Sequence, residues 1–228
     1  MPTLTLNKGG SIIGSVGSNQ ATARDVTTGT SIIQDASSTN ADQYFKSSRR
    51  GGGTFRYVRS FLQFDASAIT GTVTAATLNI ESHGTNNSSD VIVITSDAFG
   101  GASSDLVNSD FDNVDFSTTY SSEITSWNTN GANNAITLNA AARSAISSNN
   151  SFICAIINHD SDFQDTDSLS GDGNESNGID FAGTITLAVT VAAAGPANLT
   201  SLNTIAKASI TSFNTITLAN IDEINTIS

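Results

Sequence analysis

The stretch 55–81, FRYVRSFLQFDASAITGTVTAATLNIE, constrains the fold more than any other part of the chain. Leu62 and Phe64 occupy alternate positions, so they point to one face of an extended strand while their neighbours point to the other. The connector 66–74 is small and polar and predicts a turn. Apolar and polar residues then alternate over 76–81, which predicts a second, half-buried strand. On its pattern alone, the stretch predicts a β-hairpin.

The remainder of the chain also favours strands over helices. Four further segments have a strand pattern: 91–95, 135–138, 151–157 and 184–191. Asn139 can cap one short, Ala-rich helix over 140–146. Thr, Ser and Asn are abundant while Lys and Glu are scarce, a composition typical of sheets and loops. We therefore predict an all-β fold.

Two sequence patterns resemble a known family. The form R-S-F-L-Q-F-D-x-S-x-I, then V-x-x-A-x-L-x-I, over 59–80 resembles the entry hairpin of jelly-roll β-sandwich modules. These modules occur in secreted carbohydrate-binding proteins and in phage structural proteins. The later order of strand, Leu-Asn, short helix, Phe-led strand and Asn-His-Asp resembles them too. The resemblance covers roughly 30–191 and implies one jelly-roll β-sandwich over 1–191.

Residues 1–30 are expected to form an N-terminal arm and the first strand. Leu4 and Leu6 alternate with polar residues and predict a short opening strand. The glycines at 9, 10, 14 and 17 predict that the segment then becomes irregular. Such an arm can lie against a neighbouring molecule or fray.

The charge of the chain limits its partners. The formal net charge is −12, which argues against nucleic acid, because binding to phosphates relies on cationic contacts. No apolar run approaches the roughly 20 residues of a membrane span, and the first ten residues have no apolar core of a signal peptide. We expect no membrane partner and no signal peptide. The single Cys154 lies in an apolar run and is expected to be a buried, inert thiol.

A basic segment at 46–59 carries five of the nine Lys and Arg residues beside three consecutive glycines. One interpretation is a mobile basic loop that meets an acidic neighbour, such as another copy of the chain. The alternative is a solvated hairpin loop. The segment is no phosphate-binding loop, because it lacks Gly-Lys-Ser/Thr and a following helix.

An acidic loop follows His159 and contains no base of its own. Carboxylate oxygens are the ligands that calcium prefers, so the loop is a candidate calcium site. The alternative is a solvated acidic loop. The candidate ligands are Asp160, Asp162, Asp165, Asp167, Asp172 and Glu175.

Catalytic motifs are missing from the sequence, and exposed aromatic candidates are few. Neither His83 nor His159 lies in a Gly-x-Ser-x-Gly or His-Glu-x-x-His motif. We therefore expect that the protein is not an enzyme. A glycan platform needs aromatic faces, and Trp127 with Tyr120 is the candidate pair. Packing of both rings in the core is the alternative.

The C-terminal segment 199–228 is an internal repeat with a period of 11 residues, joined by a linker at 192–198. Asn-Thr-Ile recurs at 203, 214 and 225, and the Thr, Asn and Ile content favours short strands with corners at Asn over a helix. So short a unit cannot bury its apolar stripe alone. We expect the segment to join a homo-oligomer, most simply a trimer, with docking on another surface as the alternative. The stripe consists of Leu202, Ile205, Ile210, Phe213, Ile216, Ile221, Ile224 and Ile227.

These features lead to two functional hypotheses. The first is a phage virion component, such as a capsid decoration protein, a neck or tail appendage, or a fibre, located in the virion with other virion proteins as partners. The repeat also resembles the Ile/Asn-rich C-terminal repeats of marine phage structural proteins, although Thr rather than Gly follows the central Asn here. The second is a carbohydrate-binding module that attaches to host or environmental glycans.

Overall fold

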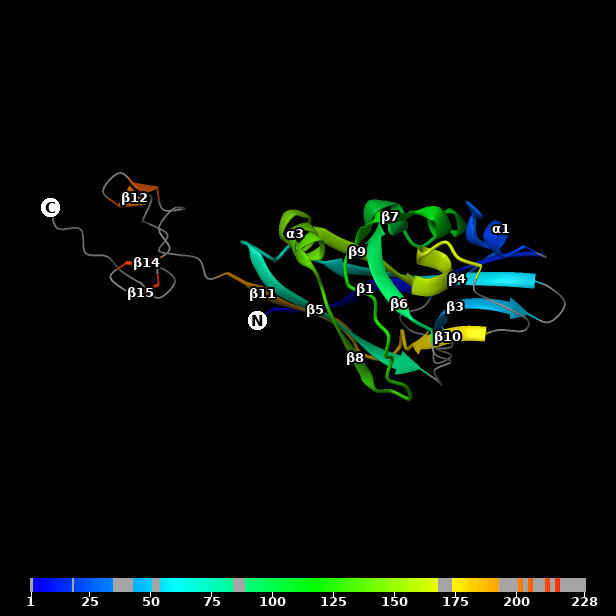
Figure 1. Cartoon of the computed structure of the whole chain (residues 1–228). Helices are drawn as coiled ribbons and strands as arrows, with labels where there is room; N and C mark the ends of the chain where they lie inside the picture. The colour runs from blue at the N-terminus through cyan, green and yellow to red at the C-terminus, as the bar shows by residue number, and fades with distance from the viewer. Residues whose placement is uncertain are drawn as a thin grey trace.

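The computed structural model describes residues 2–17, 19–34, 43–50, 54–83, 89–167 and 174–192, and four two-residue strands beyond residue 200 (Figure 1). The strands of the main sheet are β1 (Thr3–Gly17), β2 (Ser31–Gln34), β3 (Gln43–Arg50), β4 (Thr54–Asp65), β5 (Val73–His83), β6 (Val91–Ser96), β7 (Val114–Thr119), β8 (Asn133–Thr137), β9 (Ser151–Asn158), β10 (Asn174–Ile179) and β11 (Ile185–Val191). The helices and helical turns are α1 (Gln20–Arg24), α2 (Ala98–Gly101), η1 (Asn108–Asp112), α3 (Ala140–Ser148) and η2 (His159–Phe163). None of these helices is long and apolar enough to cross a membrane, within the part of the chain described.

The main strands form an antiparallel sheet that curls on itself, which confirms the predicted all-β class. The strand order is β2-β1-β11-β5-β10-β3-β4-β9-β6-β7, with β8 paired to β5. The long strand β1 connects two parts of this sheet. Its residues Thr3 to Thr5 pair with β11, whereas Leu6 to Gly17 pair with β4, with a bulge between Leu6 and Lys8.

The prediction of a hairpin at 55–81 is wrong, because its two strands exist but do not pair with each other. β4 pairs with β1, β3 and β9, while β5 pairs with β11, β10 and β8. The connection between them therefore crosses from one part of the curled sheet to another. Strand alternation reports which side chains are buried, and it carries no information on which strands are neighbours.

Two apolar cores lie on opposite faces of β4, as its alternation predicts. Leu62 and Phe64 pack in the larger core with residues of β5 and β11, while Tyr57 and Phe61 pack in a second core. The second core also contains Phe99 and Phe111, so the segments around α2 and η1 cover this face. β4 is therefore buried on both sides, and any polar side chain on it needs a partner inside the protein.

The N-terminal glycines lie in a regular strand, so the predicted irregular arm is wrong for 9–17. A Cβ atom on Gly14 would lie 2.5 Å from Cζ of Phe111, and one on Gly9 would lie 2.8 Å from Cδ1 of Phe181. These glycines leave room for aromatic rings against the strand. Close packing therefore outweighs the weak strand propensity of glycine.

The helix predicted at 140–146 is confirmed as α3, Ala140–Ser148. Asn139 caps it, because its side chain accepts a hydrogen bond of 3.1 Å from the backbone N–H of Ala142. The inward side chains Ala142 and Ile146 pack on the larger core.

Cys154 is fully buried in β9, and burial raises the pKa of its thiol. We expect the native protein to be inert to a thiol reagent such as Ellman's reagent, because the thiolate is the reactive form. Labelling should require unfolding and should appear in urea with the same midpoint as the loss of β circular dichroism. Rapid labelling of the native protein in buffer would contradict this.

Beyond residue 200 the structure describes four two-residue strands in two antiparallel pairs. β12 (Ser201–Leu202) pairs with β13 (Ile205–Ala206), and β14 (Ser212–Phe213) pairs with β15 (Ile216–Thr217). In each hairpin the apolar pair is in register: Leu202 with Ile205, and Phe213 with Ile216. Ile210, Ile221, Ile224 and Ile227 of the predicted stripe lie outside the described residues.

Candidate functional site

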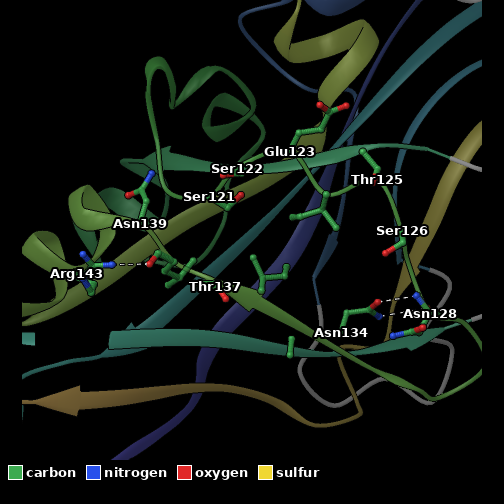
Figure 2. Close-up of a pocket in the computed structure, with 14 residues that line it drawn as sticks. Ser121, Ser122, Glu123, Thr125, Ser126, Asn128, Asn134, Thr137, Asn139 and Arg143 are labelled. Carbon is green, nitrogen blue, oxygen red and sulfur yellow. Dashed lines mark hydrogen bonds between the residues drawn. The ribbon is translucent and has the colours of Figure 1, made fainter. Parts of the chain in front are cut away.

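A polar pocket with a volume of about 540 Å³ lies between the segment 121–128, β8 and the start of α3 (Figure 2). Its lining is mostly hydroxyl and amide groups, with one acid, Glu123, and one base, Arg143. The hydroxyl-bearing residues are Ser121, Ser122, Thr125, Ser126 and Thr137. Such a lining suits a neutral, hydroxyl-rich ligand.

Hydrogen bonds to the backbone hold several of these lining side chains in place. Asn134 accepts a bond of 2.7 Å from the N–H of Asn128, and Asn139 donates one of 2.7 Å to the carbonyl of Thr119. Arg143 donates through Nη1 to the carbonyl of Leu138 at 3.1 Å. The pocket wall is therefore set by the fold before any ligand arrives.

Trp127 and Tyr120, the predicted glycan platform, are both in the larger core. Trp127 is 6% exposed and Tyr120 is 7% exposed. The Tyr120 ring stacks on Phe152 with centroids 5.2 Å apart, and its hydroxyl lies 2.8 Å from Oγ1 of Thr95. Neither ring offers an open face to a sugar, so the structure places both in the packing role that was the alternative.

A buried ion pair joins β4 to the turn η2. Arg59 and Asp162 each have a side chain that is 1% exposed. Nε and Nη2 of Arg59 donate to the two carboxylate oxygens of Asp162 at 2.9 and 2.8 Å. Nη1 donates to the carbonyl of Phe111 at 2.7 Å, and Nη2 donates to that of Arg24 at 3.1 Å. Arg59 was expected in a solvated or mobile basic loop, and for this residue that interpretation is wrong.

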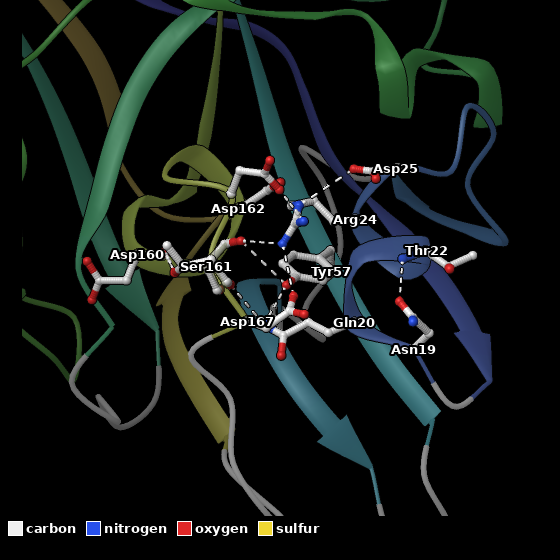
Figure 3. A network of polar contacts seen from close by, with 12 residues as sticks. Asn19, Gln20, Thr22, Arg24, Asp25, Tyr57, Asp160, Ser161, Asp162 and Asp167 are labelled. Atoms are coloured by element: carbon white, nitrogen blue, oxygen red, sulfur yellow. Dashed lines mark hydrogen bonds and ion pairs between the residues drawn. The ribbon is translucent and has the colours of Figure 1, made fainter.

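A second arginine, Arg24 of α1, contacts carboxylates of the same loop (Figure 3). It contacts Asp165 and lies 3.5 Å from Asp167, and Nη1 donates to the carbonyl of Ser161 at 3.2 Å. The acidic loop has no base in its own sequence, yet two arginines from distant elements pair with three of its carboxylates.

The candidate calcium ligands are therefore dispersed. Of the six, Asp172 and the side chain of Glu175 lie outside the described residues. Asp162 pairs with Arg59, while Asp165 and Asp167 pair with Arg24. Asp160 lies elsewhere, beside His159. The structure does not bring these four described carboxylates around one point.

One group of three side chains in the described part of the chain is able to hold a metal ion: Glu123, His159 and Asp160. Nδ1 of His159 lies 3.2 Å from Oε1 of Glu123 and 3.0 Å from Oδ1 of Asp160. Asp90 lies next to this group. Burial, followed by the charges of Asp160 and Glu123, raises the pKa of the Asp90 carboxyl above its usual value.

No family model matches this chain, and no curated protein matches it.

Proposed function

We propose that this chain is a structural component of a virion, one that assembles through its C-terminal repeat and displays its β-domain outward. The domain assignment that goes with it is a jelly-roll β-sandwich over 1–191, a linker at 192–198 and an assembly segment at 199–228. Support for the jelly-roll class comes from the sequence resemblance and from the antiparallel strand order, in which β1 serves two parts of one curled sheet.

The repeated hairpin is the observation that carries this proposal. Copies 11 residues apart have the same pairing, Leu202 with Ile205 and Phe213 with Ile216. A hairpin with two residues in each strand has no independent stability in water. The segment therefore needs an apolar surface from elsewhere, and equivalent segments of a cyclic trimer supply one most simply.

The test of the virion assignment is mass spectrometry of purified particles. Phage particles released from the host that carries this sequence should contain the chain at a stoichiometry that survives washing in high salt. If the chain is recovered only in the soluble lysate and is absent from the particles, the assignment is contradicted.

Glycan binding is the second candidate function, and the polar pocket favours it. The pocket presents hydroxyl, amide, carboxylate and guanidinium groups from three elements, and a sugar hydroxyl can both donate to and accept from such groups (Figure 2). On a glycan array we expect specific binding that Thr137→Trp abolishes, because the indole would fill the pocket. Thr74→Trp, at an exposed position of β5 outside this pocket, serves as the control. Binding that survives Thr137→Trp would exclude this site.

A further inference from the structure

The group formed by Glu123, His159 and Asp160 differs from the three neighbouring carboxylates of the acidic loop that pair with arginine. Asp162, Asp165 and Asp167 each have an arginine partner. Within the described residues, Glu123 and Asp160 have no ion pair with Lys or Arg, and the one basic group between them is the imidazole of His159. We propose that these three residues bind a first-row divalent metal ion such as Zn²⁺.

The spacing of the ligand atoms fits a metal. All three lie within 4.8 Å of one another, and Nδ1 is 3.0 and 3.2 Å from the two carboxylate oxygens. Ligands bound to zinc at about 2.0–2.2 Å are separated by about 3.3 Å in a tetrahedron. An ion can therefore enter with small side-chain rotations.

The backbone brings the ligands together from two segments far apart in sequence, one with Glu123 and one with His159 and Asp160. The N–H of His159 donates to the carbonyl of Asp90 at 2.8 Å. Next to Asp90, Val91 and Ile124 form a two-way backbone bridge, with bonds of 3.1 and 2.8 Å, which fixes Glu123 beside the end of β9.

The side chain of His159 has partners at both ring nitrogens. Its Nε2 lies 3.1 Å from the side-chain nitrogen of Gln164, so the amide donates to Nε2 and the ring proton is on Nδ1, between the two carboxylates. A metal ion at Nδ1 replaces this proton, and Gln164 then accepts a proton from Nε2 once its amide has turned by half a rotation. The ring also stacks on Phe163 with centroids 5.7 Å apart, and only 13% of the side chain is exposed. The imidazole is therefore already held in one orientation.

The donor set selects the class of ion. Calcium takes six to eight oxygen ligands, whereas one imidazole nitrogen with two carboxylates suits zinc, manganese or a similar ion. Cys154 is buried and does not compete as a ligand. A bound ion would join the segment 121–126, which forms one wall of the polar pocket, to the end of β9.

The test uses untagged, full-length protein freed of metal with EDTA and then dialysed. Titration with zinc chloride by calorimetry should give one site per chain, and the melting temperature should rise with zinc concentration. Millimolar calcium or magnesium should leave the melting temperature unchanged. Glu123→Gln and His159→Gln should each remove the site, and Gln164→Ala should weaken it by about 10- to 100-fold.

The control is His83→Gln, which removes the one other histidine of the chain and should keep the zinc affinity of the parent. Glu123 is 40% exposed, so its variant is expected to fold even if the His159 variant does not. Three outcomes would overturn the proposal: no zinc site in the parent, an unchanged site in Glu123→Gln, or an equal rise in melting temperature with calcium.

Discussion

Replacing Asp162 by Asn should lower the free energy of unfolding by about 3–5 kcal/mol, the usual cost of removing one partner from a buried ion pair. The substitution leaves the guanidinium of Arg59 without its counter-charge in a place where its side chain is 1% exposed. Arg59 also lies 4.2 Å from the ring centroid of Phe111, so water has no ready access to that face. Urea unfolding, followed by circular dichroism, measures the change.

Two further variants separate the charge effect from simple loss of a side chain. Asp105→Asn removes a carboxylate that is 77% exposed and lies 3.5 Å from Lys8, and such a surface pair contributes less than about 1 kcal/mol. Arg59→Met combined with Asp162→Leu should recover much of the stability lost in the single variant, because no buried charge remains. A single Asp162→Asn variant within 1 kcal/mol of the parent would contradict the role assigned to this pair.

Deleting 197–228 should convert the proposed oligomer to a folded monomer. The predicted stripe holds eight large apolar side chains in 30 residues without a cysteine, so the segment has no internal means of burying them. The β-domain, in contrast, has two cores of its own and closes its sheet without the repeat. The truncated chain should therefore keep the β circular dichroism and the cooperative melting of the full chain.

Residue patterns in the sequence predicted those parts of the fold that depend on residues close together in the chain. Alternation in β4 and β5 placed Leu62, Phe64 and Leu78 in the core, and the cap at Asn139 placed α3. The same pattern could not give strand neighbours, and β4 and β5 turned out not to pair. It also failed for the glycines of β1, because the rings that pack against them come from Phe111 and Phe181, far away in sequence.

The site residues were harder to predict from the sequence, because tertiary structure determines which residues they contact. Arg59 lies between Tyr57 and Phe61 on one face of a strand, and this spacing was a readable signal for a buried arginine. Its partner Asp162 is 103 residues away, and nothing local identifies it. Glu123 reaches His159 only because the bridge between Val91 and Ile124 fixes its segment.

The central claim, assembly through the C-terminal repeat, is tested most directly by light scattering coupled to size exclusion. The full chain should elute with a mass three times the 23.5 kDa of one protomer, at any protein concentration well above the dissociation constant of the trimer. The chain lacking 197–228 should elute with the mass of one protomer and the same β circular dichroism. A full chain that is monomeric, or a truncated chain that keeps the oligomeric state of the full one, would contradict the account.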